Sequence, residues 1–504
     1  MRFMRSAGIL LHPTSLPGPY GSGDLGVPAY HFIDWLHAAG QALWQMLPIG
    51  PAGMANSPYM VSSAFAGSPL LIDLQELREL GWLDNFEADG FCNISDHRID
   101  YAAVTRFRME KLQAAANKFF RVIRNGQRDQ YESFCISERY WLDDYALFQS
   151  LNRHYDGQEW TGWETKLARR NPATLRAAEK EFGLDIQFHK FIQWCFVRQW
   201  NKLKGYAHER GVQLIGDIPF FIAGHSADVW AHPEDYSLDE NGIPTHVAGV
   251  PPDYFSAAGQ RWGNPLYRWE VMKEKKYQWW VERFQKTFEL FDIVRIDHFR
   301  GFESYWEVPA KEKTAIHGEW RQGPGEDFFK IVRKKIGKLP IIAEDLGIIT
   351  DKVRALRDAL DFPGMRVLHF AFASGPDHEY LPHRYNANCV VYTGTHDNDT
   401  TCGWYAKASE HEKDFVRRYC QTNGNAIHWD LIRLALQSHA DIAIVPFQDV
   451  LGLDSESRMN IPGTIDGNWE WRFTWDQVGS YPAERMYELS ALYGRTDPNK
   501  LHLL

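Results

Sequence analysis

Eight short apolar runs, separated by segments of helical pattern, restrict the fold of this chain more than any other feature. The runs cover residues 7–12, 42–49, 212–221, 291–299, 339–347, 364–372, 388–397 and 441–452. Several are almost continuously hydrophobic, as parallel strands buried on both faces are. Helical patterns lie between them, for example at 351–361 and 429–439. Eight strands that alternate with helices predict an α/β fold, a (β/α)8 TIM barrel.

Two connections between the runs are too long for a simple strand–helix unit, so we expect one barrel, residues 1–504, with large inserted subdomains. The first insertion, about 75–205, is predicted to be mainly helical, because apolar residues recur there at helical spacing. They are Leu112, Ala115, Ala116, Phe119 and Ile123, and later Phe188, Ile192, Cys195 and Phe196. The second, about 222–285, is rich in Gly, Pro and aromatic residues and is predicted to be an irregular lid.

The composition narrows the classes of partner. The net charge of −10 argues against nucleic acid or an anionic membrane, and no apolar run is long enough to span a membrane. The six cysteines are scattered without a CxxC pair, which fits reduced thiols. We therefore expect a cytoplasmic protein, or a plastid protein whose transit peptide was removed. The 20 Trp and 22 Tyr residues suit a large core, and their rings also suit sugar ligands.

Acidic residues end several of the predicted strands. They are Asp217 in the third run, Asp297 in the fourth, Glu344 in the fifth and Asp397 in the seventh. Barrel active sites lie at the C-terminal ends of the strands, so we expect these acids on one rim. Arg295 shares a strand face with Asp297, because side chains alternate along a strand.

Two interpretations of these charges remain open. Arg295 and Asp297 can form a structural ion pair, since buried charges often do so and such pairs also shift pKa values. Alternatively, two carboxylates flank a glycosidic bond, one as nucleophile and the other as proton donor. The arginine then keeps the nucleophile ionised, and a third acid stabilises positive charge on the sugar. Four acids on one rim favour the second interpretation.

Patterns typical of several other chemistries are missing from the sequence. It contains no HExxH or paired-cysteine zinc motif, no GxGxxG after the first run, no GxxxxGK[ST] phosphate loop and no GxSxG elbow. His298 and His396 adjoin acids. Metal ligation, a hydrogen bond to a substrate hydroxyl and a place in the core are each open for these two histidines.

Three stretches, "IVRIDHFRGF" (293–302), "IIAEDLG" (341–347) and "YTGTHDND" (392–399), resemble the 4-alpha-glucanotransferases (amylomaltases, or disproportionating enzymes) of glycoside hydrolase family 77, in the alpha-amylase clan. Further matches run along almost the whole chain, among them "GILLHPTSLPGPYGSGDLG", "VPPDYFSAAGQRWGNPLYRW", "RMNIPGT" and "NWEWR". The resemblance implies a barrel without the C-terminal β-sandwich domain of other amylases. It also implies a reaction that needs neither a metal nor an organic cofactor.

The same resemblance implies residue roles. Asp297 is the expected nucleophile, Glu344 the general acid/base and Asp397 the transition-state stabiliser. The expected substrate-binding residues are Tyr59, Asp217, Asp253, Tyr254, Phe255, Gln260, Trp262, Arg295, His298, His396 and Asn460. The implied reaction is retaining transfer of a segment of an alpha-1,4-glucan or maltooligosaccharide to the 4-hydroxyl of glucose or another glucan.

Two other functions remain open at this point. An alpha-amylase-like hydrolase would use the same acids, but it would raise the number of reducing ends, which transfer conserves. A non-catalytic glucan-binding protein would have an aromatic groove, yet binding sugars does not require three carboxylates on one rim.

Residues 251–265, "PPDYFSAAGQRWGNP", are the best candidates to shield a reaction intermediate from water. Tyr254 and Phe255 offer apolar surface, and we expect them beside the acceptor groove. Replacing both with Ala is expected to lower the transfer-to-hydrolysis ratio while Asp297 still forms the intermediate. The measurement is the number of reducing ends released from maltotriose per transfer event. An unchanged ratio in a folded, active double mutant would rule this segment out as the water barrier.

Overall fold

A closed barrel of eight parallel strands forms the centre of the molecule. The computed structural model describes residues 2–86, 95–123, 125–252 and 256–496. The barrel strands are β1 (Ser6–Leu10), β2 (Leu43–Gln45), β3 (Gln213–Ile218), β6 (Ile293–Ile296), β9 (Ile341–Ala343), β10 (Gly364–Val367), β11 (Cys389–Tyr392) and β12 (Ile442–Pro446). They close in the order β1-β12-β11-β10-β9-β6-β3-β2. Each overlaps one of the eight apolar runs, so the predicted (β/α)8 TIM barrel is confirmed.

Burial on both faces explains the continuous hydrophobicity of these strands. Every residue of β11 and of β12 is buried, so neither strand has the polar alternation of a half-exposed strand. The helical patterns at 351–361 and 429–439 correspond to α13 (Asp351–Ala359) and α16 (Ile427–Gln437). Thr350 begins α13 by accepting a hydrogen bond from the amide of Val353 with its hydroxyl oxygen.

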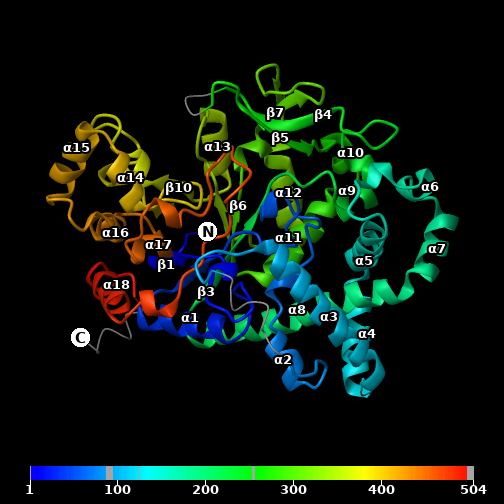
Figure 1. Ribbon diagram of the computed structural model, residues 1–504. Helices are drawn as coiled ribbons and strands as arrows, with labels where there is room; N and C mark the ends of the chain where they lie inside the picture. Colours follow the sequence, from blue (N-terminus) through cyan, green and yellow to red (C-terminus); the bar gives the residue numbers. More distant parts are fainter. Residues whose placement is uncertain (1, 87–94, 124, 253–255, 497–504) are drawn as a thin grey trace.

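Between β2 and β3 the chain is mostly helical. The helices are α2 (Leu74–Glu79), α3 (Tyr101–Val122), α4 (Asn125–Ser137), α5 (Arg139–His154), α6 (Thr165–Ala168), α7 (Pro172–Glu181) and α8 (Gly183–Glu209). Figure 1 shows α3–α7 together at one side of the barrel. The predicted stripe residues of α3 and α8 are buried, except Ile123, which lies just beyond the end of α3 and is partly buried. The subdomain boundaries at about 75–205 stay a prediction.

A second, four-stranded sheet lies over the barrel, at the top of Figure 1. Its strands are antiparallel, in the order β5 (Gln260–Pro265), β4 (His246–Val250), β7 (Ser304–Pro309) and β8 (Glu319–Gln322). The segment 222–285 also contains α9 (Ala227–Ala231), α10 (Trp269–Glu274) and most of α11 (Gln278–Leu290). The segment thus includes regular elements, and its description as an irregular lid stays a prediction. Local patterns do not show this sheet, because β4 pairs with β7, which follows β6 in the chain.

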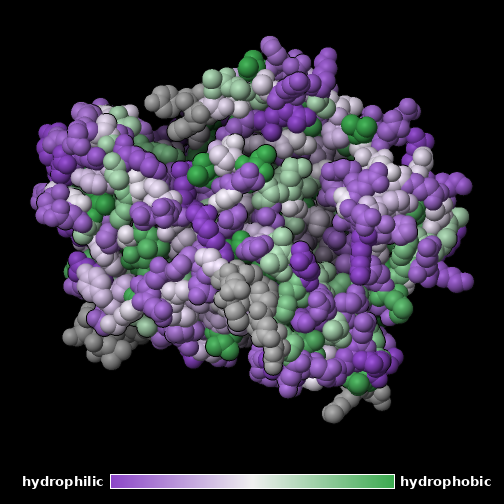
Figure 2. Space-filling view, in the orientation of Figure 1, coloured by the Kyte–Doolittle hydropathy of each residue, from purple (hydrophilic) through white to green (hydrophobic). Residues whose placement is uncertain are grey.

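The remaining helices lie between barrel strands along the chain or after the last of them. They are α1 (Val27–Ala38), α12 (Gly325–Ile336), α14 (Thr401–Lys407), α15 (Glu410–Cys420), α17 (Phe447–Val450) and α18 (Tyr481–Leu492). Five tryptophans are among the largest fully buried side chains: Trp44, Trp82, Trp200, Trp230 and Trp280. Hydrophilic residues cover most of the face in Figure 2, and hydrophobic ones form small separate patches. Among the described helices, none combines the length and apolar character needed to cross a membrane.

Candidate active site

Neighbouring barrel strands bring the predicted acids to one rim. Asp217 lies in β3, Asp297 directly follows β6 and Glu344 directly follows β9. Strand β6 pairs with β3 on one side and with β9 on the other, and Asp217 lies beside Arg295 in register. Because parallel strands end at the same face of a barrel, these groups meet at its C-terminal rim. Asp397 belongs to the same rim, on the loop that follows β11.

Arg295 holds two of these acids in different ways. Its Nη1 atom donates to both carboxylate oxygens of Asp217, at 2.8 and 2.7 Å, and Nη2 donates to Oδ1 of Asp297 at 3.0 Å. The Asp217 side chain is fully enclosed and also accepts a hydrogen bond of 2.8 Å from the Tyr59 hydroxyl. The Asp297 side chain remains 31% exposed. Asp217 is thus the buried ion-pair partner, whereas Asp297 is the acid that a ligand can reach.

The charge on Arg295 stabilises this arrangement. Burial lowers the pKa of the guanidinium, but the carboxylates of Asp217 and Asp297 outweigh it and hold the pKa well above its usual value. The group therefore stays positive at any physiological pH. This permanent positive charge lies 3.0 Å from Oδ1 of Asp297, a suitable neighbour for an anionic nucleophile.

Glu344 has the opposite environment. Its Oε2 accepts a hydrogen bond of 2.7 Å from the backbone amide of His298, and its Oε1 accepts one of 2.7 Å from the amide of Leu346. Burial, followed by the negative charge of Asp297, raises the pKa of Glu344 to about 7, against the opposing effects of Arg295 and the two amides. A carboxyl group with this pKa can be protonated near neutral pH, which suits a general acid.

The backbone at His298 forms the link between the two acids. This residue directly follows Asp297 and has a left-handed φ of 51°, which costs a non-glycine residue about 1–2 kcal/mol. In this conformation its amide donates to Glu344. The backbone next to Asp297 therefore also holds the carboxyl group of Glu344 in place. Burial lowers the pKa of the His298 side chain to about 3, so its ring is neutral.

Asp397 is an open carboxylate with 48% of its side chain exposed. Its Oδ1 accepts a hydrogen bond of 2.6 Å from the Asn460 amide and lies 3.4 Å from Nε2 of His396. Burial lowers the pKa of His396 and favours its neutral ring. That ring stacks on Tyr59, with centroids 5.1 Å apart and planes at 18°. Three predicted binding residues therefore lie together around Asp397.

The second sheet contributes two more of the predicted residues. Trp262 in β5 packs its ring against His298, with centroids 4.8 Å apart and planes at 85°. The Trp262 indole also donates a hydrogen bond of 3.1 Å to the side chain of Gln260. This sheet therefore reaches the loop that carries Asp297. The other predicted residues of the segment, Asp253, Tyr254 and Phe255, lie outside the described residues.

The possible metal ligands of the described chain lie elsewhere. His232, Glu234 and Asp235 offer ligand atoms within 4.8 Å of one another. The ammonium group of Lys275 lies 2.7 Å from a Glu234 oxygen and 2.6 Å from an Asp235 oxygen, so a side chain of the protein already neutralises these acids. The roles left open for His298 and His396 stay open; in the structure the His298 ring packs against Trp262 and the His396 ring lies beside Asp397.

Sequence reasoning missed two residues beside the site. Trp469 lies with its ring centroid 5.9 Å from those of both Tyr59 and His396. Arg458 donates to the backbone oxygens of Asp397 and Asn460. Arg458 lies in the stretch "RMNIPGT" and Trp469 in "NWEWR". These matches to the family were the only sequence feature that pointed to the two residues. The amides of His298 and Leu346 carry no sequence signal, because every non-proline residue has one.

Comparisons with known proteins identify the family of this chain. The family model described as 4-alpha-glucanotransferase, glycoside hydrolase 77, matches residues 11–477. A 4-alpha-glucanotransferase of Synechocystis is 48% identical over 97% of this chain and 98% of its own length. One of Thermus thermophilus is 48% identical over 94% and 95% of the two chains. The structure of an amylomaltase from Streptococcus agalactiae in complex with acarbose matches with a TM-score of 0.94 and 34% identity, over 98% of this chain and 100% of that one. The chain belongs to glycoside hydrolase family 77, the 4-alpha-glucanotransferases.

Proposed function

We propose that this protein is a retaining 4-alpha-glucanotransferase whose reaction passes through a glucosyl ester of Asp297. The observation that carries the proposal is the pair of neighbouring carboxyl groups with opposite environments. Asp297 is held by a permanent positive charge and reaches solvent, while the pKa of Glu344 is raised to about 7. Double displacement at a glycosidic bond requires one ionised and one protonated carboxyl group. Family membership supports the same reaction class.

In the first half-reaction Asp297 attacks the anomeric carbon of an alpha-1,4-glucan. The bond from that carbon to the glycosidic oxygen breaks, and Glu344 transfers its proton to this oxygen, so the shortened glucan leaves as an alcohol. The sugar passes through a state with positive charge on its ring, which the nearby Asp397 carboxylate stabilises. A glucosyl ester on Asp297 results, with inverted configuration at the anomeric carbon.

In the second half-reaction Glu344 acts as the base. Ester formation removes the negative charge of Asp297, which is one of the causes that raise the pKa of Glu344. The ionised form of Glu344 is therefore favoured at the point where a base is needed. It accepts the proton of an acceptor 4-hydroxyl, whose oxygen attacks the anomeric carbon and displaces Asp297. This second inversion restores the alpha configuration and returns Glu344 to its protonated form.

The proposed donors are alpha-1,4-glucans and maltooligosaccharides, and the proposed acceptors are glucose or the 4-hydroxyl of another glucan. The acarbose complex of the Streptococcus agalactiae relative supports glucan binding by this chain. We further propose a reducing compartment, the cytoplasm or a plastid, because the five cysteines among the described residues are all free thiols.

The pKa of Glu344 predicts a pH dependence. Glycosylation needs the protonated carboxyl group, so kcat/KM for maltotriose is expected to fall as the pH rises through about 7. A glucosyl fluoride donor needs little proton transfer to its leaving group, so its kcat/KM should lose this alkaline limb. Paired pH profiles with the two donors make the measurement. The same decline for both donors would mean that another group causes it.

Incubation with maltotriose alone tests the proposed activity. Transfer should yield glucose together with longer maltooligosaccharides, at a constant number of reducing ends. Chromatography identifies the products, and a reducing-end assay counts the bonds lost to water. A rise in reducing ends that matches the loss of maltotriose would identify a hydrolase instead.

A further inference from the structure

The carboxylate of Asp397 depends on residues that are distant in the sequence. Asp397 lies on the loop between β11 and α14, and its side chain is 48% exposed. The Asn460 amide donates to its Oδ1 at 2.6 Å. A half-exposed side chain on a loop samples several rotamers unless its neighbours hold it. The residues that hold Asn460 in contact with Asp397 therefore matter for catalysis.

Arg458 joins the two segments. Its Nη2 atom donates to the backbone oxygen of Asp397 at 2.5 Å, and its Nε atom donates to the backbone oxygen of Asn460 at 2.7 Å. Nε and one terminal nitrogen lie on the same edge of the planar guanidinium, so a single rigid group spans both carbonyls. A flexible ammonium group cannot reproduce this spacing.

We propose that Arg458 is a positioning residue for glucan transfer, which sets the orientation of the Asp397 carboxylate through Asn460. This inference rests on the proposed function. Asn460 is also held from its other side, because residues 459–469 form a closed loop. The Trp469 amide donates to the Met459 oxygen at 2.7 Å, and the Ile461 amide donates to the Asn468 side chain at 2.8 Å. Arg458 attaches this closed loop to the loop of Asp397.

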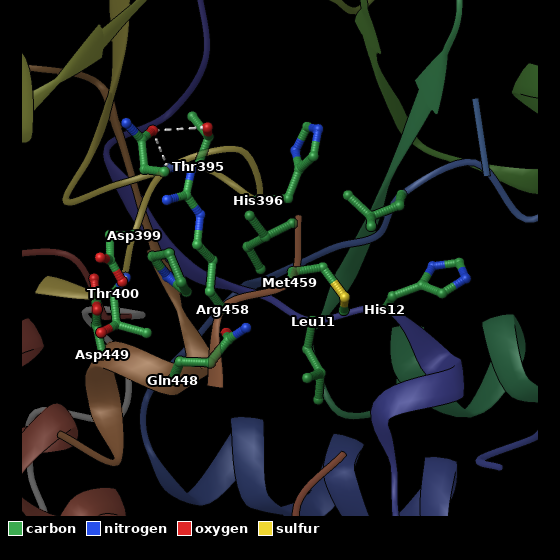
Figure 3. A pocket seen from close by; sticks show the side chains of 14 residues that line it. Leu11, His12, Thr395, His396, Asp399, Thr400, Gln448, Asp449, Arg458 and Met459 are labelled. Carbon is green, nitrogen blue, oxygen red and sulfur yellow. Dashed lines mark hydrogen bonds between the residues drawn. The ribbon is translucent and has the colours of Figure 1, made fainter. Parts of the chain in front are cut away.

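The surroundings of Arg458 argue against a plain ion pair as its role. It lines a small pocket together with His396, Asp399 and Asp449, and in Figure 3 its side chain extends toward Thr395. The Asp399 carboxylate accepts from Lys407 at 2.6 Å and from Ser455 at 2.8 Å. Asp449 accepts from Thr393 and Thr401. Both acids are thus engaged elsewhere, and the Arg458 bonds named above go to backbone oxygens.

The inference predicts a specific kinetic defect. Loss of the guanidinium leaves the substrate contacts in place but lets the Asp397 carboxylate rotate, so kcat falls while KM changes little. We expect a loss of roughly 10- to 100-fold in kcat for Arg458→Ala, the size typical of residues that orient a functional group. Both half-reactions pass through a positively charged sugar, so a glucosyl fluoride donor should not restore the rate.

Chemical rescue distinguishes positioning from a general structural role. Arg458→Ala should regain part of its kcat in millimolar guanidinium chloride, but not in sodium chloride. Arg433→Ala is the matched control, since Arg433 also donates to a backbone oxygen, that of Cys420 at 3.1 Å, and lies in α16, which carries none of the catalytic acids. Neither this control nor the wild-type protein should gain activity from guanidinium.

Two results would overturn the inference: an Arg458→Ala protein with wild-type kcat, or a folded, slow Arg458→Ala protein that guanidinium fails to restore. If the alanine variant does not fold, Arg458→Lys provides the test. This variant keeps the positive charge and much of the side-chain volume but loses the planar guanidinium group. Its kcat is expected to fall at unchanged KM, and a wild-type kcat would contradict the inference. If the wild-type protein performs no transfer, the proposed function itself fails, which is a separate result.

Discussion

Replacing Asp297 with Asn is expected to lower the rate of glucan transfer by roughly 10⁴-fold or more, the scale seen when a covalent catalyst loses its nucleophile. The amide keeps the shape of the carboxylate but cannot attack the anomeric carbon. Arg295 retains both bonds to Asp217, so the free energy of unfolding should change by only about 1 kcal/mol. Product formation from maltotriose and denaturant unfolding measure the two effects.

Asp217→Asn is the matched control, because Asp217 shares the same guanidinium but is enclosed. Removing its charge leaves a buried arginine with one remaining acid, so it is expected to lower the free energy of unfolding by about 3 kcal/mol. Asp217→Asn should therefore cause the larger loss in the free energy of unfolding, and Asp297→Asn the larger loss in the rate of glucan transfer. A folded Asp297→Asn protein with near-normal transfer, or one destabilised as much as Asp217→Asn, would assign Asp297 to the structural ion pair.

Replacing Glu344 with Gln is expected to slow transfer between maltooligosaccharides by roughly 10²- to 10⁴-fold. The amide preserves the acceptor oxygen for one backbone bond but supplies no proton to the leaving glucan. With a glucosyl fluoride donor the first half-reaction needs less acid help, so formation of the intermediate should be partly restored. Azide should then raise turnover, because it attacks the intermediate without a general base, and alpha-glucosyl azide is the expected product.

The two rescues separate Glu344 from residues with other roles. Loss of Asp397 or of its orientation slows both half-reactions for every donor, so neither fluoride nor azide should help in that case. Wild-type protein in azide is the control for nonspecific effects of the salt. If Glu344→Gln responds to neither the fluoride donor nor azide, then Glu344 is not the acid/base.

The sequence predicts the barrel well, because buried parallel strands leave a continuous apolar signal. All eight runs overlap strands, but several runs extend past them, since the loops at the strand ends are also packed. The run 339–347, for example, contains β9 only at Ile341–Ala343, and Glu344 follows it. The second sheet was not predicted. Its strands β4 and β7 lie far apart in the chain, and their pairing depends on contacts that local periodicity does not report.

The acids of the site were also predictable, from their positions at strand ends and from the resemblance. The electrostatic environment of Glu344 was not. The raised pKa of Glu344 depends on burial and on the amides of His298 and Leu346, which follow from backbone geometry. The predicted substrate contact of Asn460 stays a prediction, and its hydrogen bond to Asp397 was not foreseen. Such tertiary contacts between distant segments have no local sequence signature.

The most direct test of the central claim identifies the atom that carries the sugar. A 5-fluoroglucosyl fluoride should react with the protein faster than its ester is released, because the ring fluorine slows the second half-reaction while fluoride leaves easily. Digestion and mass spectrometry should then locate one 5-fluoroglucosyl group on Asp297, and adding maltose should remove it by transfer. A label on Asp217 or any other residue, or turnover of this donor without a covalent adduct, would contradict the account.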